Sequence, residues 1–120
     1  MITGAFDGNR PLISLIVGWQ LEVVEIVALI DTGFTGELKL SPARASKLGL
    51  QITHTESVTL ADEKSVNMPA GLAQVAMEGI TDTVSVLIGE GTPIIGVGLL
   101  RKFGYNLNID FKTDSIILKR

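Results

Sequence analysis

The sequence contains no cysteine, which excludes disulfide bonds, thiolate metal sites and a cysteine nucleophile. It contains a single histidine, His54, which lies among threonine and glutamate in a polar stretch. No catalytic triad or metal-binding cluster surrounds it in the sequence. We therefore interpret His54 as a solvated strand residue rather than a catalytic group.

Long hydrophobic runs and blocks of positive charge are also absent. The longest apolar runs, Leu12–Trp19 and Val23–Ile30, are too short to cross a bilayer. The N-terminus lacks a basic start followed by an apolar core, so we predict no signal peptide and a cytoplasmic protein. With a net charge of −3 and scattered lysines and arginines, we expect neither nucleic acid nor an anionic membrane as a partner.

The composition is that of a compact folded protein. The chain has 120 residues, of which 46% are hydrophobic and 19% charged, which favours a folded core over disorder. This length suits one domain, and we predict that residues 1–120 form it.

The apolar pattern predicts a mostly β chain with two short helices. The first helix is expected within Ser41–Gly49, because Ser41 can cap it, Pro42 suits its first position and Gly49 can end it. The second is expected at Val97–Phe103, before Gly104. Strands are expected at Met1–Phe6, Leu12–Val17, Leu21–Ile30, Glu37–Leu40, Leu50–Ile52, Ser57–Leu60, Ser65–Met68, Leu72–Met77, Thr83–Ile88, Ile94–Gly96, Asn106–Phe111 and Ile116–Leu118.

The two halves of the sequence resemble each other. Residues Lys47–Ile52 match Lys102–Leu107 in chemical type at every position, at a spacing of 55 residues. At the same spacing Gly36 matches Gly91. A structural unit used twice suggests a pseudo-symmetric β barrel.

Chemistry-bearing residues are concentrated in the segment Ile26–Gly36. Its β-branched apolar run predicts a buried strand that ends in Asp31, followed by Thr32 and Gly33. A carboxylate at the end of a buried strand needs a reason, because burying it unpaired is costly. Catalysis is one reason, and an ordinary Asp-Thr-Gly turn is the other. The tripeptide alone favours the turn.

Taken together, these features resemble the retropepsin-like aspartic proteases, the single-domain relatives of pepsin. The shared pattern is an apolar strand with Asp31-Thr32-Gly33, a hairpin around Ala61–Ser65, and Ile94-Ile95-Gly96 before a short helix. The segment from Asp31 to Leu38, followed by a capped helix, is closest to bacterial and archaeal members. The resemblance implies an all-β fold: a closed, pseudo-symmetric acid-protease β barrel with a flap hairpin and one or two short helices.

The resemblance implies an aspartic endopeptidase that needs neither metal nor cofactor. Two Asp31 carboxylates, one from each subunit of a homodimer, would share a proton and activate water against a peptide or protein substrate. Thr32 would brace the two active-site loops and Gly33 would line the cleft. The implied substrate-binding residues are Phe34, Ala61, Asp62, Glu63, Ile94, Ile95 and Gly96.

The sequence departs from the retroviral pattern at two places. Gly96-Val97-Gly98 stands where retroviral members often have Gly-Arg, so the dimer contact must differ. The flap tip Asp62-Glu63-Lys64 is charged rather than glycine-rich, which would favour basic or polar substrates or slow opening. The terminal strands Met1–Phe6 and Ile116–Leu118 are either dimer contacts, as is common in this family, or internal edge strands of the barrel.

Two other functions use the same fold. A non-catalytic module could keep the barrel and bind a peptide or partner in the cleft, although it would have no need for a costly carboxylate pair. A structural dimerisation domain would belong to a larger assembly with its chemistry elsewhere. The intact Asp-Thr-Gly motif favours the protease.

Overall fold

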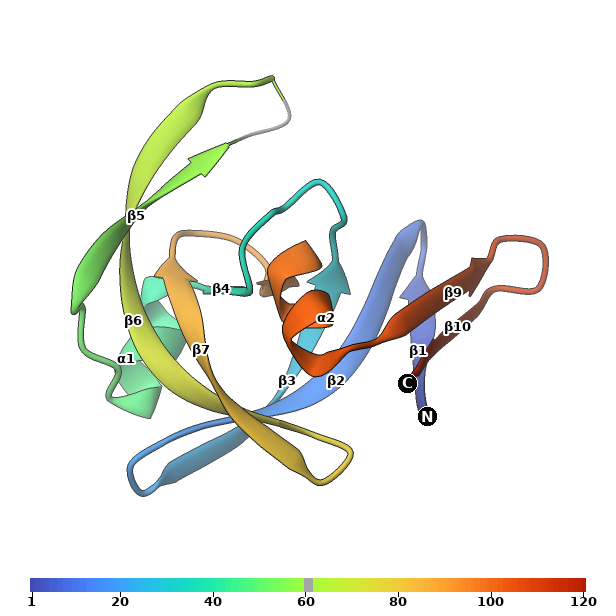
Figure 1. Ribbon diagram of the computed structural model, residues 1–120, viewed down its shortest axis with the longest axis horizontal. Helices are drawn as coiled ribbons and strands as arrows, with labels where there is room; N and C mark the ends of the chain where they lie inside the picture. Colours follow the sequence, from blue (N-terminus) through green and yellow to red (C-terminus); the bar gives the residue numbers. More distant parts are fainter. Residues whose placement is uncertain (60–61) are drawn as a thin grey trace.

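The computed structural model describes residues 1–59 and 62–120, which form ten strands and two short helices (Figure 1). In chain order these are β1 (Ile2–Asp7), β2 (Arg10–Trp19), β3 (Glu22–Ile30), β4 (Leu38–Leu40), α1 (Pro42–Leu48), β5 (His54–Thr59), β6 (Ser65–Met77), β7 (Ile80–Ile88), β8 (Ile94–Ile95), α2 (Val97–Phe103), β9 (Asn106–Asp110) and β10 (Ser115–Lys119). The predicted fold class, mostly β with two short helices, is confirmed.

Strands from both halves of the chain close into a ring. Neighbouring strands follow the order β6, β7, β4, β8, β3 and β2, and β2 pairs back onto β6 from Ile16↔Ala76 to Gly18↔Gln74. The short strands β4 and β8 connect the halves, because β4 runs parallel to β7 and β8 runs parallel to β3. The closed ring agrees with the predicted barrel.

The core fills the inside of this ring. Alternate residues of β2 and β3 point inward, among them Ile13, Val17, Ile26 and Ala28, and each is at most 2% exposed. Leu99 of α2 joins the same apolar cluster. Burying a side chain of this size contributes about 1.5–3 kcal/mol, so the core is the main source of stability.

A long hairpin of β5 and β6 projects from the body of the molecule, at the top of Figure 1. The two strands pair from His54↔Ala70 to Thr59↔Ser65. The hairpin lies where the sequence predicts the flap. Leu60 and Ala61 lie outside the described residues.

The chain termini form a second extension, on the right of Figure 1. Strand β1 pairs with β10 over Ile2–Gly4 and with β2 over Ala5–Asp7, and β10 also pairs with β9. The terminal strands are thus paired within the chain but lie outside the closed ring, and their part in a dimer contact stays a prediction. The outer edge of this extension is β9.

Both predicted helices are confirmed. Ser41 caps α1, since its Oγ accepts a hydrogen bond from the Arg44 backbone N–H, and Gly49 ends the helix in the left-handed conformation. Neither helix in the described part of the chain has the length and hydropathy needed to cross a membrane.

Candidate active site

Asp31 stands at the end of β3, where the second half of the chain holds it in place. Ile30 pairs with Ile95 of β8, and the Asp31 backbone N–H donates to the Ile95 carbonyl oxygen at 3.0 Å. The parallel pairing of β3 and β8 therefore extends one residue past the end of β3 and fixes the backbone of the carboxylate residue.

The Asp-Thr-Gly turn holds the carboxylate as well as reversing the chain. The Gly33 N–H donates to Asp31 Oδ1 at 2.9 Å, and the Phe34 N–H donates to the Asp31 carbonyl oxygen at 3.1 Å. A Cβ on residue 33 would lie 3.2 Å from Oδ1, so glycine allows the close approach. The same turn that reverses the chain also positions the carboxylate. An ordinary turn and a catalytic role for Asp31 therefore do not exclude each other.

The loop that follows the motif rests on the beginning of α2. The Val97 N–H donates to the Phe34 carbonyl oxygen at 2.9 Å, and the Gly98 N–H donates to the Gly36 carbonyl oxygen at 3.0 Å. The first N–H groups of a helix have no partners within the helix, and here the loop carbonyls provide them. The loop and α2 therefore form one unit beneath Asp31.

Glycines make this contact possible. A Cβ on Gly96 would collide with the carbonyl oxygens of Phe34 and Gly36, and one on Gly98 would lie 2.9 Å from the Gly36 oxygen. Such distances would force the loop away from the helix. The predicted site residue Gly96 thus lies beneath the motif loop.

A polar contact locks the far end of the loop. The Glu37 carboxylate accepts a hydrogen bond from the Ser85 backbone N–H at 2.7 Å and pairs with Lys102 of α2 at 3.0 Å. Lys102 also donates to the Thr83 carbonyl oxygen at 2.8 Å. Loop, β7 and α2 are therefore tied together.

The carboxylate opens onto a cavity of about 310 Å³, here called the Asp31 cavity. Its apolar walls belong to a small cluster, separate from the main core, that includes Phe34, Val58 and Leu87 with Met68 and Ile94 packed against it. Among the residues that the structure describes, the lining is Asp31, Gly33, Phe34, Lys39, Val58, Thr59, Met68, Leu87 and Ile94. A mostly apolar pocket with a few polar groups is typical of a binding site.

Some predicted site residues meet at this cavity and others do not. Asp31, Gly33, Phe34 and Ile94 line it. Thr32 is exposed beside Asp31, and among the described residues its hydroxyl makes no hydrogen bond. Ile95 is buried in the core. Gly96 occupies the N-cap position of α2 without a side-chain cap, and Asp62 and Glu63 lie at the hairpin tip. Ala61 lies outside the described residues.

Five lining residues were not predicted from the sequence: Lys39, Val58, Thr59, Met68 and Leu87. The sequence did contain an indication for Lys39. It stands between Leu38 and Leu40 on a strand, so its side chain faces away from the core that the two leucines enter. Val58 and Met68 reach the cavity only because the hairpin bends over Asp31, which periodicity does not reveal.

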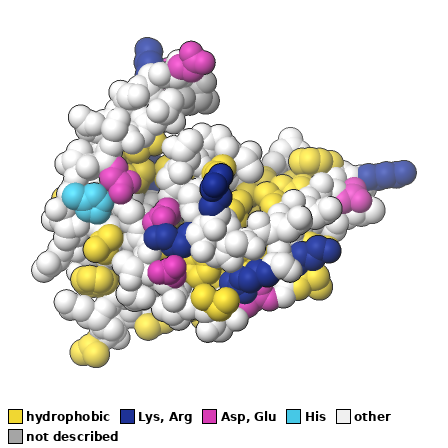
Figure 2. Space-filling model, in the orientation of Figure 1, with side chains coloured by type: hydrophobic (Ala, Val, Ile, Leu, Met, Phe, Trp, Pro, Cys, Tyr) yellow, Lys and Arg dark blue, Asp and Glu magenta, His cyan; other side chains and the backbone are white. Residues whose placement is uncertain are grey.

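His54 belongs to a polar cluster at the base of the hairpin. Its Nε2 lies 3.1 Å from Glu56 Oε1 and 3.3 Å from Ser85 Oγ, and its Nδ1 lies 2.8 Å from Thr53 Oγ1. Figure 2 shows the histidine, in cyan, beside an acidic side chain at the left edge. A nucleophilic triad needs the acid and the serine on opposite ring nitrogens. Here Glu56 and Ser85 are both near Nε2, so they do not form such a triad with His54. Because Ser85 lies on β7, the cluster ties β5 to β7.

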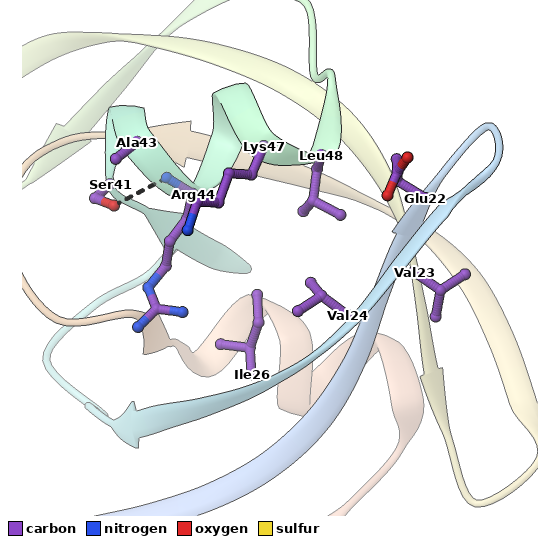
Figure 3. A pocket seen from close by; sticks show the side chains of 9 residues that line it. All are labelled: Glu22, Val23, Val24, Ile26, Ser41, Ala43, Arg44, Lys47 and Leu48. Atoms are coloured by element: carbon purple, nitrogen blue, oxygen red, sulfur yellow. Dashed lines mark hydrogen bonds between the residues drawn. The ribbon is translucent and has the colours of Figure 1, made fainter.

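A second hollow, of about 520 Å³, lies between α1 and β3 (Figure 3). Val24, Ile26 and Leu48 point toward one another in it, while Val23 points away. Its charged side chains are Glu22, Arg44 and Lys47, and Asp31 does not line it. The larger volume does not make it the better candidate, because the Asp-Thr-Gly motif lies at the other cavity.

No family model matches the sequence, and no curated protein matches it. Solved structures do match the fold, among them the following two. A retropepsin-like aspartic protease from Rickettsia conorii matches over 98% of this chain and 87% of its own, with 21% identity and a TM-score of 0.64. EIAV protease, in complex with the inhibitor HBY-793, matches over 83% of this chain and 93% of its own, with 16% identity and a TM-score of 0.61. The chain therefore has the retropepsin-like fold.

Proposed function

We propose that this protein is a homodimeric aspartic endopeptidase, in which the two Asp31 carboxylates activate one water molecule. The observation that carries the proposal is the position of Asp31, held by Gly33 and by β8 at an apolar cavity within a retropepsin-like fold. A carboxylate placed only to end a strand would not need a pocket beside it.

The proposal requires a second copy of the chain. Asp31 is the one carboxylate among the described residues that line the cavity. Acid catalysis of this kind needs two, and a two-fold axis supplies the second from an identical subunit. The exposed Thr32 would then meet its counterpart across the axis.

The chemistry follows from the closeness of two like charges. Two adjacent carboxylates do not both ionise easily, so the pair retains one proton. The ionised partner takes a proton from water as the water attacks the peptide carbonyl carbon. The protonated partner donates a hydrogen bond to the carbonyl oxygen and stabilises the developing oxyanion. The β5–β6 hairpin would cover the substrate and exclude bulk water.

The test replaces Asp31 by Asn and measures hydrolysis of a peptide mixture by mass spectrometry. Asp31→Asn should abolish cleavage and leave the thermal unfolding temperature nearly unchanged, because Asn keeps the shape but cannot share the proton. Asp7→Asn, the same change in an exposed ion pair with Arg10, should cleave normally. Activity should be highest on the acid side of neutrality and unaffected by a metal chelator. Full activity in Asp31→Asn would refute the proposal.

A binding measurement separates the protease from a non-catalytic module with the same barrel. The EIAV neighbour was solved with HBY-793, so this inhibitor is a probe that requires no known substrate. The protease should both bind HBY-793 and cleave peptides. Binding without cleavage of any peptide would favour the module.

A further inference from the structure

Lys39 is the one positively charged side chain among the described residues that line the Asp31 cavity. Its neighbours Leu38 and Leu40 are fully buried in the core, so alternation turns Lys39 to the opposite face of β4. It pairs with Leu87 of β7 and with Ile94 of β8, and both of these line the cavity. Lys39 therefore extends from the floor of the cavity.

The lysine chain is held in a defined direction. Its Nζ donates to the Glu90 carbonyl oxygen at 2.5 Å. A Cβ on Gly89 would lie 3.1 Å from Lys39 Cε, and one on Gly91 would lie 3.5 Å from Nζ. The two glycines thus leave room for the lysine to lie against the loop between β7 and β8.

The charge of Lys39 has no carboxylate partner in residues 1–59 and 62–120: no acidic oxygen of this part of the chain lies within ion-pair distance. An ammonium group has three N–H donors, and the Glu90 carbonyl takes one. Lys39 is half-buried beside apolar walls, where an unpaired charge is unfavourable. A carboxylate entering the cavity would find two free donors and an opposite charge.

We propose that Lys39 determines specificity: the Asp31 cavity accepts a substrate side chain that ends in a carboxylate, glutamate above all. Phe34, Val58 and Leu87 would contact its aliphatic stem, while Lys39 binds its carboxylate. Glutamate has a longer stem than aspartate and so reaches over the apolar walls better. This inference rests on the proposed function and names its substrate class.

The charged hairpin tip does not oppose this preference. Asp62 and Glu63 are not among the residues that line the cavity, and the Asp62 carboxylate accepts a hydrogen bond from the Lys64 backbone N–H at 3.1 Å. The charge of Lys39, which lines the cavity, rather than the charge of the tip, would act on a bound side chain.

The test compares peptides that carry Glu or Gln at each position around the cleaved bond. The wild-type protein should favour Glu at one position by about tenfold in kcat/KM, the range expected when a hydrogen bond gains charge assistance. The preference should fade as the pH falls through the glutamate pKa, about 4.3 in a free peptide. Lys39→Met should lose it, Lys39→Arg should keep it, and Lys39→Glu should prefer Lys at that position.

A matched control and a second readout make each outcome decisive. Lys47→Met removes an exposed lysine of α1 and should keep the glutamate preference. Binding of the same peptides to Asp31→Asn, with and without Lys39→Met, gives the preference without catalysis. Cleavage with no glutamate preference, or a preference that survives in Lys39→Met, overturns the role of Lys39 alone. Absence of cleavage together with Lys39-dependent glutamate binding overturns the protease and supports the role of Lys39. Failure of both readouts overturns both proposals.

Discussion

The two halves of the molecule build the same helix for different purposes. Helices α1 and α2 have seven residues each and lie 55 residues apart in the sequence. Both end at a left-handed glycine, Gly49 with φ of 72° and Gly104 with φ of 69°. The hydrogen bonds that follow also correspond, since Leu50 donates to Ala45 and Tyr105 donates to Leu100, each at 3.0 Å.

The difference lies at the N-terminal ends of these helices. Ser41 caps α1 with its side chain, and the corresponding residue of α2 is Gly96, which has no side chain to cap with. Gly96 instead allows the loop after Asp31 to lie directly on α2. The first half therefore stabilises its helix locally, whereas the second half gives up the cap to support the carboxylate loop.

The largest effect should come from adding a methyl group beneath that loop. Gly96→Ala should lower the free energy of unfolding by about 3 kcal/mol, because its Cβ would collide with two backbone oxygens. Ser41→Ala, at the corresponding position, should lower it by about 1 kcal/mol through loss of the cap. Urea unfolding of both variants checks the difference, and equal losses would show that the two helix ends play the same part.

The left-handed glycines at the other helix ends should behave alike. Gly49→Ala and Gly104→Ala should each lower the free energy of unfolding by about 1 kcal/mol, since both residues have positive φ and open space where the Cβ would go. The same urea experiment measures both. If one variant lost more than twice the unfolding free energy that the other lost, the ends of the two helices would not be structurally equivalent.

A smaller effect distinguishes the two lysines at corresponding positions. Lys102 pairs with Glu37 and donates to Thr83, whereas Lys47 is exposed on α1. Lys102→Met should lower the free energy of unfolding by about 0.5 kcal/mol, a modest value because the pair is partly exposed and screened. Lys47→Met is the control and should change it very little. An equal effect in both variants would show that Lys102 does not help to hold the loop.

The smallest effect should appear at acid pH in the β9–β10 hairpin, which follows α2. Backbone N–H groups of Lys112 and Thr113 hold the pKa of Asp110 below its ordinary value of 3.8. A lowered pKa in the folded state favours the ionised form. This stabilisation is therefore present above the ordinary value and is lost as the pH falls through the lowered one. An NMR titration of the Asp110 carboxyl carbon should show the lowered pKa, and a midpoint at or above 3.8 would contradict it.

The sequence predicted the features that depend on neighbouring residues. Both helices, the turn after Asp31 and the spacing of the two halves follow from caps, glycines and periodicity. Closure of the ring was expected only from the repeat and the family resemblance, and its register between β2 and β6 was not predictable, because those strands are far apart in the chain. The bend that brings Val58 over Phe34 and the cluster around His54 likewise depend on contacts between distant strands.

The central claim is that each active site takes one Asp31 from each of two chains. Its most direct test mixes wild-type protein with Asp31→Asn at constant total concentration, after the subunits have been allowed to exchange. If a site needs two intact chains, activity should follow the square of the wild-type fraction, and an equimolar mixture should retain about a quarter of the full activity. An activity that falls in proportion to the wild-type fraction, to half at the equimolar point, would show that each chain works alone and would contradict the account.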